Sequence, residues 1–138
     1  MKYHIVIPAR MASQRLPGKP LAMVGGATLI EHVYRRASSA AAESAVVATD
    51  ATEILETCHA FGATAIMTSA GHSSGSDRIA ECADLMGWTD DTLIVNLQGD
   101  EPLMPAVCLD QAARLLHDHA SASVASLYHA IDSVSYTH

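Results

Sequence analysis

The sequence contains few aromatic residues: one tryptophan, one phenylalanine and four tyrosines, or 4% of 138 residues. Ring stacking therefore cannot dominate the core. Apolar residues nevertheless make up 49% of the chain, so we expect a core of alanine, valine, isoleucine, leucine and methionine. A chain of this length can bury roughly 70% of the surface that its unfolded form exposes. These features predict one domain in which small, alanine-rich helices pack on a sheet.

Cysteine is also scarce, and its spacing excludes a disulfide framework. Cys58, Cys82 and Cys108 are odd in number, and no two of them form a C-x-x-C pair. This pattern is typical of reduced thiols in a cytoplasm, and we expect the three residues to be small core residues. No basic and apolar leader follows Met1, and no apolar run is long enough to span a bilayer. We predict a soluble, cytoplasmic protein without a membrane partner.

Basic residues are almost absent after residue 36. The chain has a net charge of −7, yet residues 1–36 hold six Lys/Arg and one acid, Glu31. From residue 37 onward, fourteen Asp/Glu accompany only Arg78 and Arg114. The net charge argues against a nucleic-acid or anionic-membrane partner, whereas the local positive charge would attract a small anionic ligand to the N-terminal region.

The segment from Ile7 to Leu21 holds the strongest candidate site. It follows a β-branched run and places three cations, Arg10, Arg15 and Lys19, in a loop. Prolines and a glycine break this loop at Pro8, Pro17, Gly18 and Pro20. Such a loop after a first parallel strand can surround a polyphosphate with cations and free backbone N–H groups, and Ser13 is free to add a hydroxyl. The segment predicts a nucleoside triphosphate as ligand; the alternative is that its cations are merely solvated.

Strand-like and helix-like patterns alternate along the chain. Short β-rich runs recur at residues 3–7, 45–48, 63–67, 92–96 and 122–128. Apolar residues at helical spacing predict helices over about 28–41, 52–61, 75–86 and 105–118. We expect Thr28 to cap the first helix, with Glu31 in the capping-box position, and Gly62 to end the second.

This alternation predicts an α/β fold, a Rossmann-like and mostly parallel sheet with helices on both faces and right-handed crossovers. Ligands of such sheets bind beyond the carboxyl ends of the strands. The candidate site elements are therefore the loops that follow strands. They are residues 8–27, in which Gly25 and Gly26 turn the chain into the first helix, and residues 49–51, 68–75 and 97–104.

Two further motifs carry chemistry. In the segment Ser73–Glu81, Gly75 would permit close backbone approach to a ligand, and Arg78 is either near the nucleotide or an exposed arginine after a serine cap. The segment Leu93–Pro102 is a buried strand that delivers Asp100 and Glu101 to the top of the sheet. Carboxylate oxygens suit Mg²⁺ bound to phosphates, and we assign the metal to Asp100. The alternative is a polar turn that only ends the strand.

Neighbouring residues on an extended segment point in opposite directions, so Glu101 is not expected to share the metal with Asp100. Its role stays open between holding the loop and meeting a substrate hydroxyl. Asp50 follows the second strand, and for it a helix-capping role is at least as plausible as a ligand role.

Four motifs, in this order, resemble the 3-deoxy-manno-octulosonate cytidylyltransferase (CMP-Kdo synthetase) family, of which the chain resembles the N-terminal part. They are Ile7–Leu21, Val47–Asp50, Ser74–Arg78 and Val95–Pro102. The first motif alone is shared in looser form by several nucleotide-sugar pyrophosphorylases, but the combination is more specific. The resemblance implies a Rossmann-like fold of the nucleotide-diphospho-sugar transferase type.

The resemblance also implies an activity, namely transfer of CMP from CTP to Kdo with release of pyrophosphate, for lipopolysaccharide biosynthesis in a Gram-negative bacterium. It implies Mg²⁺ as the cofactor and CTP and Kdo as partners. Arg10 and Lys19 would bind the β- and γ-phosphates, and Asp100 would bind Mg²⁺. The remaining nucleotide-site residues would be Ala9, Ser13, Arg15, Ser74, Gly75, Arg78 and Gln98, with Arg78 and Gln98 contacting the nucleotide or the sugar acid.

Family members are longer than this chain, which stops soon after a strand with no closing helix. We therefore expect residues 1–138 to be the nucleotide-binding part, and the sugar-acid-binding and dimerisation part of a homodimer to be absent. Two alternatives stay open: a CTP-binding fragment without turnover, and a related nucleotidyltransferase that acts on another sugar acid.

Overall fold

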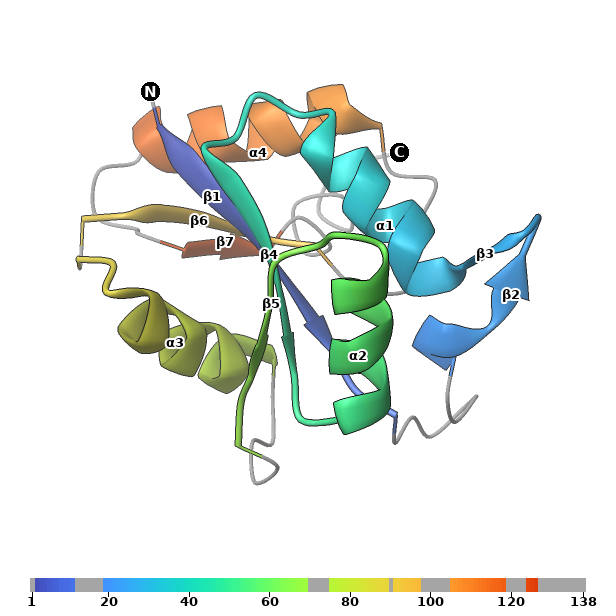
Figure 1. Ribbon diagram of the computed structural model, residues 1–138. Helices are drawn as coiled ribbons and strands as arrows, with labels where there is room; N and C mark the ends of the chain where they lie inside the picture. The colour runs from blue at the N-terminus through green and yellow to red at the C-terminus, as the bar shows by residue number, and fades with distance from the viewer. Residues whose placement is uncertain are drawn as a thin grey trace.

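Five parallel strands form the centre of the protein in the computed structural model, which describes residues 2–11, 19–69, 75–89, 91–97, 105–118 and 124–126. The strands are β1 (Tyr3–Ala9), β4 (Ser44–Thr49), β5 (Ala65–Met67), β6 (Leu93–Asn96) and β7 (Val124–Ser126). Their order in the sheet is β5-β4-β1-β6-β7 (Figure 1). The predicted parallel sheet is confirmed, and each predicted run overlaps a strand.

Four helices connect the strands: α1 (Leu29–Ser38), α2 (Thr52–Ala60), α3 (Gly75–Met86) and α4 (Ala106–Asp118). The Thr28 hydroxyl accepts a 3.3 Å hydrogen bond from the Glu31 amide, which confirms the predicted cap of α1. None of the helices in the described part of the chain is long and apolar enough to cross a bilayer.

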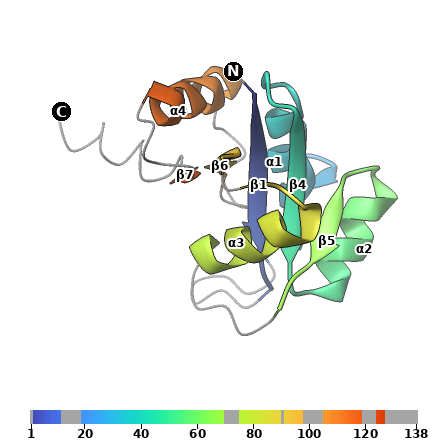
Figure 2. The ribbon, with the colours of Figure 1, turned by 90° about the vertical axis from the view of Figure 1, so that its left-hand side faces the viewer.

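The helices cover both faces of the sheet. Side chains alternate along β1, so Ile5 and Ile7 pack in one core with α1, α2 and α4, whereas Val6 packs in the other with α3. Figure 2 shows α3 on the near side of the sheet and α1 behind it. The helix residues in these cores are Ile30 and Val33 of α1, Ile54 and Cys58 of α2, Leu109 and Ala113 of α4, and Ile79 and Cys82 of α3.

The helix α4 departs from the predicted right-handed connections. The chain moves from β1 to β4 in one direction across the sheet and from β6 to β7 in the other. Two right-handed connections that run in opposite directions would lie on opposite faces, yet α4 shares its face with α1. Leu109 and Ala113 bury their side chains in that core, which holds α4 there.

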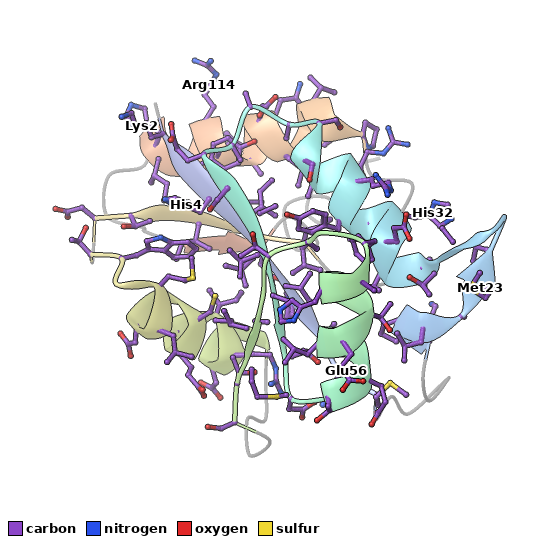
Figure 3. All side chains as sticks on the ribbon, in the orientation of Figure 1. Lys2, His4, Met23, His32, Glu56 and Arg114 are labelled. Atoms are coloured by element: carbon purple, nitrogen blue, oxygen red, sulfur yellow. The ribbon has the colours of Figure 1, made fainter. Side chains whose placement is uncertain are left out.

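The segment before α1 is not the simple loop that the sequence predicted. Residues Lys19–Leu21 form a short 3₁₀ helix, η1, and β2 (Met23–Val24) pairs with β3 (Ala27–Thr28) in an antiparallel hairpin. Gly25 and Gly26 have φ values of 61° and 91°, which a two-residue hairpin turn of the primed type requires. The hairpin projects from the body with Met23 66% exposed (Figure 3), and His32 Nε2 donates to the Val24 carbonyl at 2.5 Å.

Two of the three cysteines are core residues, as the sequence predicted. Cys58 and Cys82 are fully buried, and burial raises the pKa of their thiols to about 11 and about 12. Cys108 is partly buried. The two buried thiols are therefore neutral and unreactive near pH 7.

The start of β1 is joined to α4 by a partly buried hydrogen bond. Tyr3 is 1% exposed, and its hydroxyl donates to Asp110 Oδ1. The same oxygen accepts a 3.0 Å hydrogen bond from the Ala41 amide, which precedes β4. Burial and the Asp110 carboxylate both raise the pKa of the Tyr3 phenol. Asp110 therefore joins three segments at the amino edge of the sheet.

Replacing Tyr3 with phenylalanine is expected to lower the free energy of unfolding by about 1–3 kcal/mol, because the hydroxyl donates to a partly buried carboxylate. Urea unfolding measures this loss. A matched control is Tyr34→Phe, in which the lost hydroxyl accepts a longer, exposed bond of 3.3 Å from the Thr64 amide, so a smaller loss is expected. Equal stability of Tyr3→Phe and the wild type would show that the Tyr3–Asp110 hydrogen bond does not stabilise the fold.

Candidate functional site

Polar residues follow neighbouring strands at the carboxyl edge of the sheet. Ala9 of β1 pairs with Thr49 of β4, and Thr49 pairs with Met67 of β5. The next residues along each strand, Arg10, Asp50 and Thr68, therefore stand side by side, because adjacent strands lie about 5 Å apart. The edge combines a cation, an anion and a hydroxyl within a short distance.

The strand order reverses between β1 and β6. The described pairing of these strands ends with Val6 opposite Asn96, and the Leu97 amide donates to the Val6 carbonyl at 3.0 Å. Backbone groups of alternate residues in a strand face the same neighbouring strand, so the nitrogen of Pro8, like the carbonyl of Val6, faces β6. Proline has no N–H to donate, and the described pairing with β6 ends before Pro8. Ligands of open parallel sheets bind at such a reversal.

The predicted site residues of the N-terminal motif that the structure describes, Ala9, Arg10 and Lys19, differ in exposure. Ala9 is 5% exposed and closes β1, and Arg10 is exposed beyond it. Lys19 opens η1 and is partly buried, and its carbonyl accepts a 3.0 Å hydrogen bond from the Ala22 amide. Arg10 is therefore open to an anionic ligand at the end of the central strand.

Several predicted site residues lie outside the described residues, and their roles stay predictions. They are Ser13, Arg15, Ser74, Gln98, Asp100 and Glu101. Gly75 is the first residue of α3. The described part of the chain contains no group of three or more His, Cys, Asp or Glu side chains that could hold a metal.

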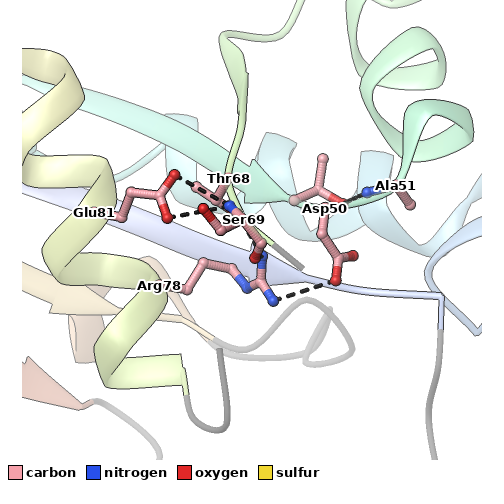
Figure 4. Close-up of polar contacts among 7 residues, drawn as sticks. Asp50, Ala51, Thr68, Ser69, Arg78 and Glu81 are labelled. Atoms are coloured by element: carbon pink, nitrogen blue, oxygen red, sulfur yellow. Dashed lines mark hydrogen bonds and ion pairs between the residues drawn. The ribbon is translucent and has the colours of Figure 1, made fainter. Parts of the chain in front are cut away.

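Arg78 is at the centre of the polar contacts at this edge (Figure 4). It is 3% exposed, so the predicted alternative of an exposed arginine is wrong. Its Nη1 donates to the Thr68 hydroxyl and, at 3.2 Å, to the Ser69 carbonyl. Its Nη2 lies 3.4 Å from Asp50 Oδ2. A buried guanidinium is stable only when it is paired and hydrogen-bonded. Here Asp50, which follows β4, neutralises the charge, and Thr68 and Ser69, which follow β5, accept hydrogen bonds.

Asp50 does not cap α2, so that alternative is also wrong. Ala51 occupies the N-cap position and makes no side-chain cap bond. The turn is instead held by Thr49, whose hydroxyl accepts a 3.1 Å hydrogen bond from the Ala51 amide. This leaves the Asp50 carboxylate, 21% exposed, to pair with Arg78.

Sequence reasoning missed the part played by Glu81. Both of its carboxylate oxygens accept hydrogen bonds of 3.1 Å from the Ser69 amide. Arg78 and Glu81 are three residues apart on α3 and share one helix face, and between them they bind the carbonyl and the amide of Ser69 (Figure 4). The sequence did contain a signal for this role, namely a basic and an acidic residue three positions apart within a predicted helix.

The chain is similar to several known proteins. The family model described as "Cytidylyltransferase" matches residues 4–137. A protein of Thioalkalivibrio sulfidiphilus named 3-deoxy-manno-octulosonate cytidylyltransferase is 52% identical over 134 residues, which are 97% of this chain and 54% of that protein. A protein of the same name from Acidovorax sp. (strain JS42) is 47% identical over 131 residues, or 95% of this chain and 50% of that protein.

A solved structure is similar as well. It is titled as CMP:2-keto-3-deoxy-manno-octonic acid synthetase complexed with CTP, and it superposes with a TM-score of 0.79 at 41% identity. The alignment covers 86% of this chain and 48% of that one. The chain thus spans about half the length of the relatives that it matches.

Proposed function

Because the chain belongs to the cytidylyltransferase family, we propose that it is the nucleotide-binding half of an enzyme that transfers CMP from CTP to Kdo, for lipopolysaccharide biosynthesis. The observation that carries this proposal is the match of nearly the whole chain to relatives with that name. The geometry supports it, because an exposed Arg10 lies at the reversal of strand order in a parallel sheet.

The reaction is an attack of the anomeric hydroxyl of Kdo on the α-phosphate of CTP. A new P–O bond forms to the sugar oxygen, the bond to the β-phosphate breaks, and the hydroxyl proton is released to solvent. Negative charge grows on the departing pyrophosphate. Arg10, Arg15 and Lys19 would bind the β- and γ-phosphates and stabilise this charge, so that positioning and charge neutralisation carry the catalysis without a protein nucleophile.

A divalent cation, which we propose to be Mg²⁺, would neutralise phosphate charge when bound. Asp100 is the residue that we propose holds it, since a carboxylate oxygen is a hard ligand. Asp100 comes three residues after Leu97, which bonds to β1 beside the strand reversal. That position is consistent with a ligand close to the phosphates bound by Arg10.

We further propose that Gln98 and Arg78 serve the nucleotide or sugar-acid region, and that the complete enzyme is a cytoplasmic homodimer. A second candidate function is a CTP-binding fragment without turnover. It is favoured by one observation, that the chain spans about half the length of its relatives.

Calorimetric titration of this chain with CTP in the presence of Mg²⁺ tests the proposal, with UTP, GTP and ATP as controls. We expect CTP to bind and the other three nucleotides to bind more weakly. Addition of Kdo followed by an assay for pyrophosphate then separates the two candidates, because release from this chain would exclude the fragment without turnover. No preference for CTP in this chain or in the full-length protein would refute the nucleotide assignment.

A further inference from the structure

We propose that Asp50 is a positioning residue for the nucleotide site and that it acts through the buried Arg78. This inference rests on the proposed function and gives a role to a residue whose role the sequence left open. Asp50 is one position beyond the Ala9–Thr49 pair and therefore stands next to Arg10 at the edge of the sheet. It does not cap the helix that follows it.

The buried Arg78 needs a counter-ion. Its side chain is 4% exposed, and a buried guanidinium is costly unless it is paired and hydrogen-bonded. Asp50, whose Oδ2 is 3.4 Å from Nη2, is the carboxylate that the structure pairs with it. Thr68 and the Ser69 carbonyl are neutral acceptors on Nη1. The carboxylate of Asp50 therefore helps to hold the Arg78 guanidinium in its buried position.

Arg78 also joins segments that are far apart in the sequence. Asp50 follows β4, Thr68 follows β5, and Arg78 belongs to α3, on the opposite face from α2. Ser69 is bound through its carbonyl by Arg78 and through its amide by Glu81. Loss of the Asp50 charge would loosen Arg78, and with it the ends of β4 and β5.

A positioning role of Asp50 and a simple effect of its charge predict opposite changes in nucleotide binding. Asp50 is an anion beside Arg10, so its removal should strengthen the binding of a polyphosphate if only the local field mattered. A positioning role has the opposite sign, because a displaced edge binds the nucleotide less well. It should also affect CTP and CMP alike, since Asp50 would act through Arg78 and not through the outer phosphates.

The test is CTP and CMP binding to Asp50→Asn, which keeps the size and removes the charge. We expect binding of both nucleotides to weaken on the order of 10-fold. Arg78→Lys should have an effect of similar size, and the double variant should be no weaker than either single variant, because the two residues act as one unit. The control is Glu53→Gln, which removes the same charge from an exposed position in the first turn of α2 and should leave binding unchanged.

Unchanged or tighter CTP binding in Asp50→Asn would overturn the inference, as would additive effects in the double variant. If Asp50→Asn does not fold, Thr68→Val is the second variant, because it removes an acceptor of Arg78 without a change in charge. Weaker binding of both nucleotides by Thr68→Val supports the inference, and wild-type binding overturns it. Absence of nucleotide binding by both the wild-type chain and the full-length protein would overturn the proposed function itself. Amide hydrogen exchange at Ser69 would then still measure the tie, since faster exchange in Asp50→Asn is expected only if Asp50 holds Arg78.

Discussion

Replacing Asp100 with alanine is expected to reduce the turnover of the full-length protein by a factor on the order of 10³ while leaving its fold intact. The proposed metal ion would neutralise phosphate charge that grows as pyrophosphate leaves, a contribution of several kcal/mol, and each 1.36 kcal/mol corresponds to about a tenfold change in rate. The measurement is pyrophosphate release from CTP and Kdo across a range of Mg²⁺ concentrations.

Asp91→Ala is the matched control for this variant. Asp91 is exposed and precedes β6 at the amino edge of the sheet, whereas Asp100 follows the same strand. The two variants lose the same charge, and only Asp100→Ala should lose activity. Wild-type turnover in Asp100→Ala would refute the metal assignment, and an equal loss in Asp91→Ala would show that the effect is one of net charge.

The parallel sheet could be predicted because its signals are local. The runs of valine and isoleucine in β1, β4 and β6 are apolar on both faces, as buried parallel strands require. The cap of α1 is equally local, since Thr28 and Glu31 are neighbours on one turn. Such features depend on residues that are close in the sequence, which is why periodicity and capping rules find them.

The hairpin β2–β3 was missed although its signal was present. Gly25 and Gly26 both take positive φ, but the strands on either side of them, Met23–Val24 and Ala27–Thr28, are only two residues long, and a run this short shows no alternation. The side of the sheet that α4 covers was also not predictable. It depends on the packing of Leu109 and Ala113 against residues that are distant in the sequence.

The contacts of Arg78 mark the limit of prediction for the site. Spacing alone could not separate a buried arginine from an exposed one, since the answer depends on Asp50, 28 residues away, and on Thr68, 10 residues away. A resemblance to a family transfers the residue types of a motif, but it does not say which charges neutralise one another. In this chain the structure separates a paired, buried cation, Arg78, from an exposed one, Arg10.

That separation leads to the second large effect, which is expected for Arg10→Ala. Arg10 is exposed beyond the end of β1, so it can offer its full charge and its N–H groups to the outer phosphates. A hydrogen bond to a charged group contributes about 1.5–3 kcal/mol, so CTP should bind roughly 10- to 150-fold more weakly. CMP lacks the outer phosphates and should lose much less affinity. Calorimetry with both nucleotides measures the difference.

Arg36→Ala is the control for a lost exposed arginine, because Arg36 lies in the last turn of α1, which leads to the amino edge of the sheet. It should leave both affinities unchanged. Because Arg10 is exposed, thermal unfolding of Arg10→Ala should match the wild type, and weaker binding then reports the site and not the fold. Equal losses for CTP and CMP would move Arg10 away from the outer phosphates and leave Lys19 and Arg15 as their cations.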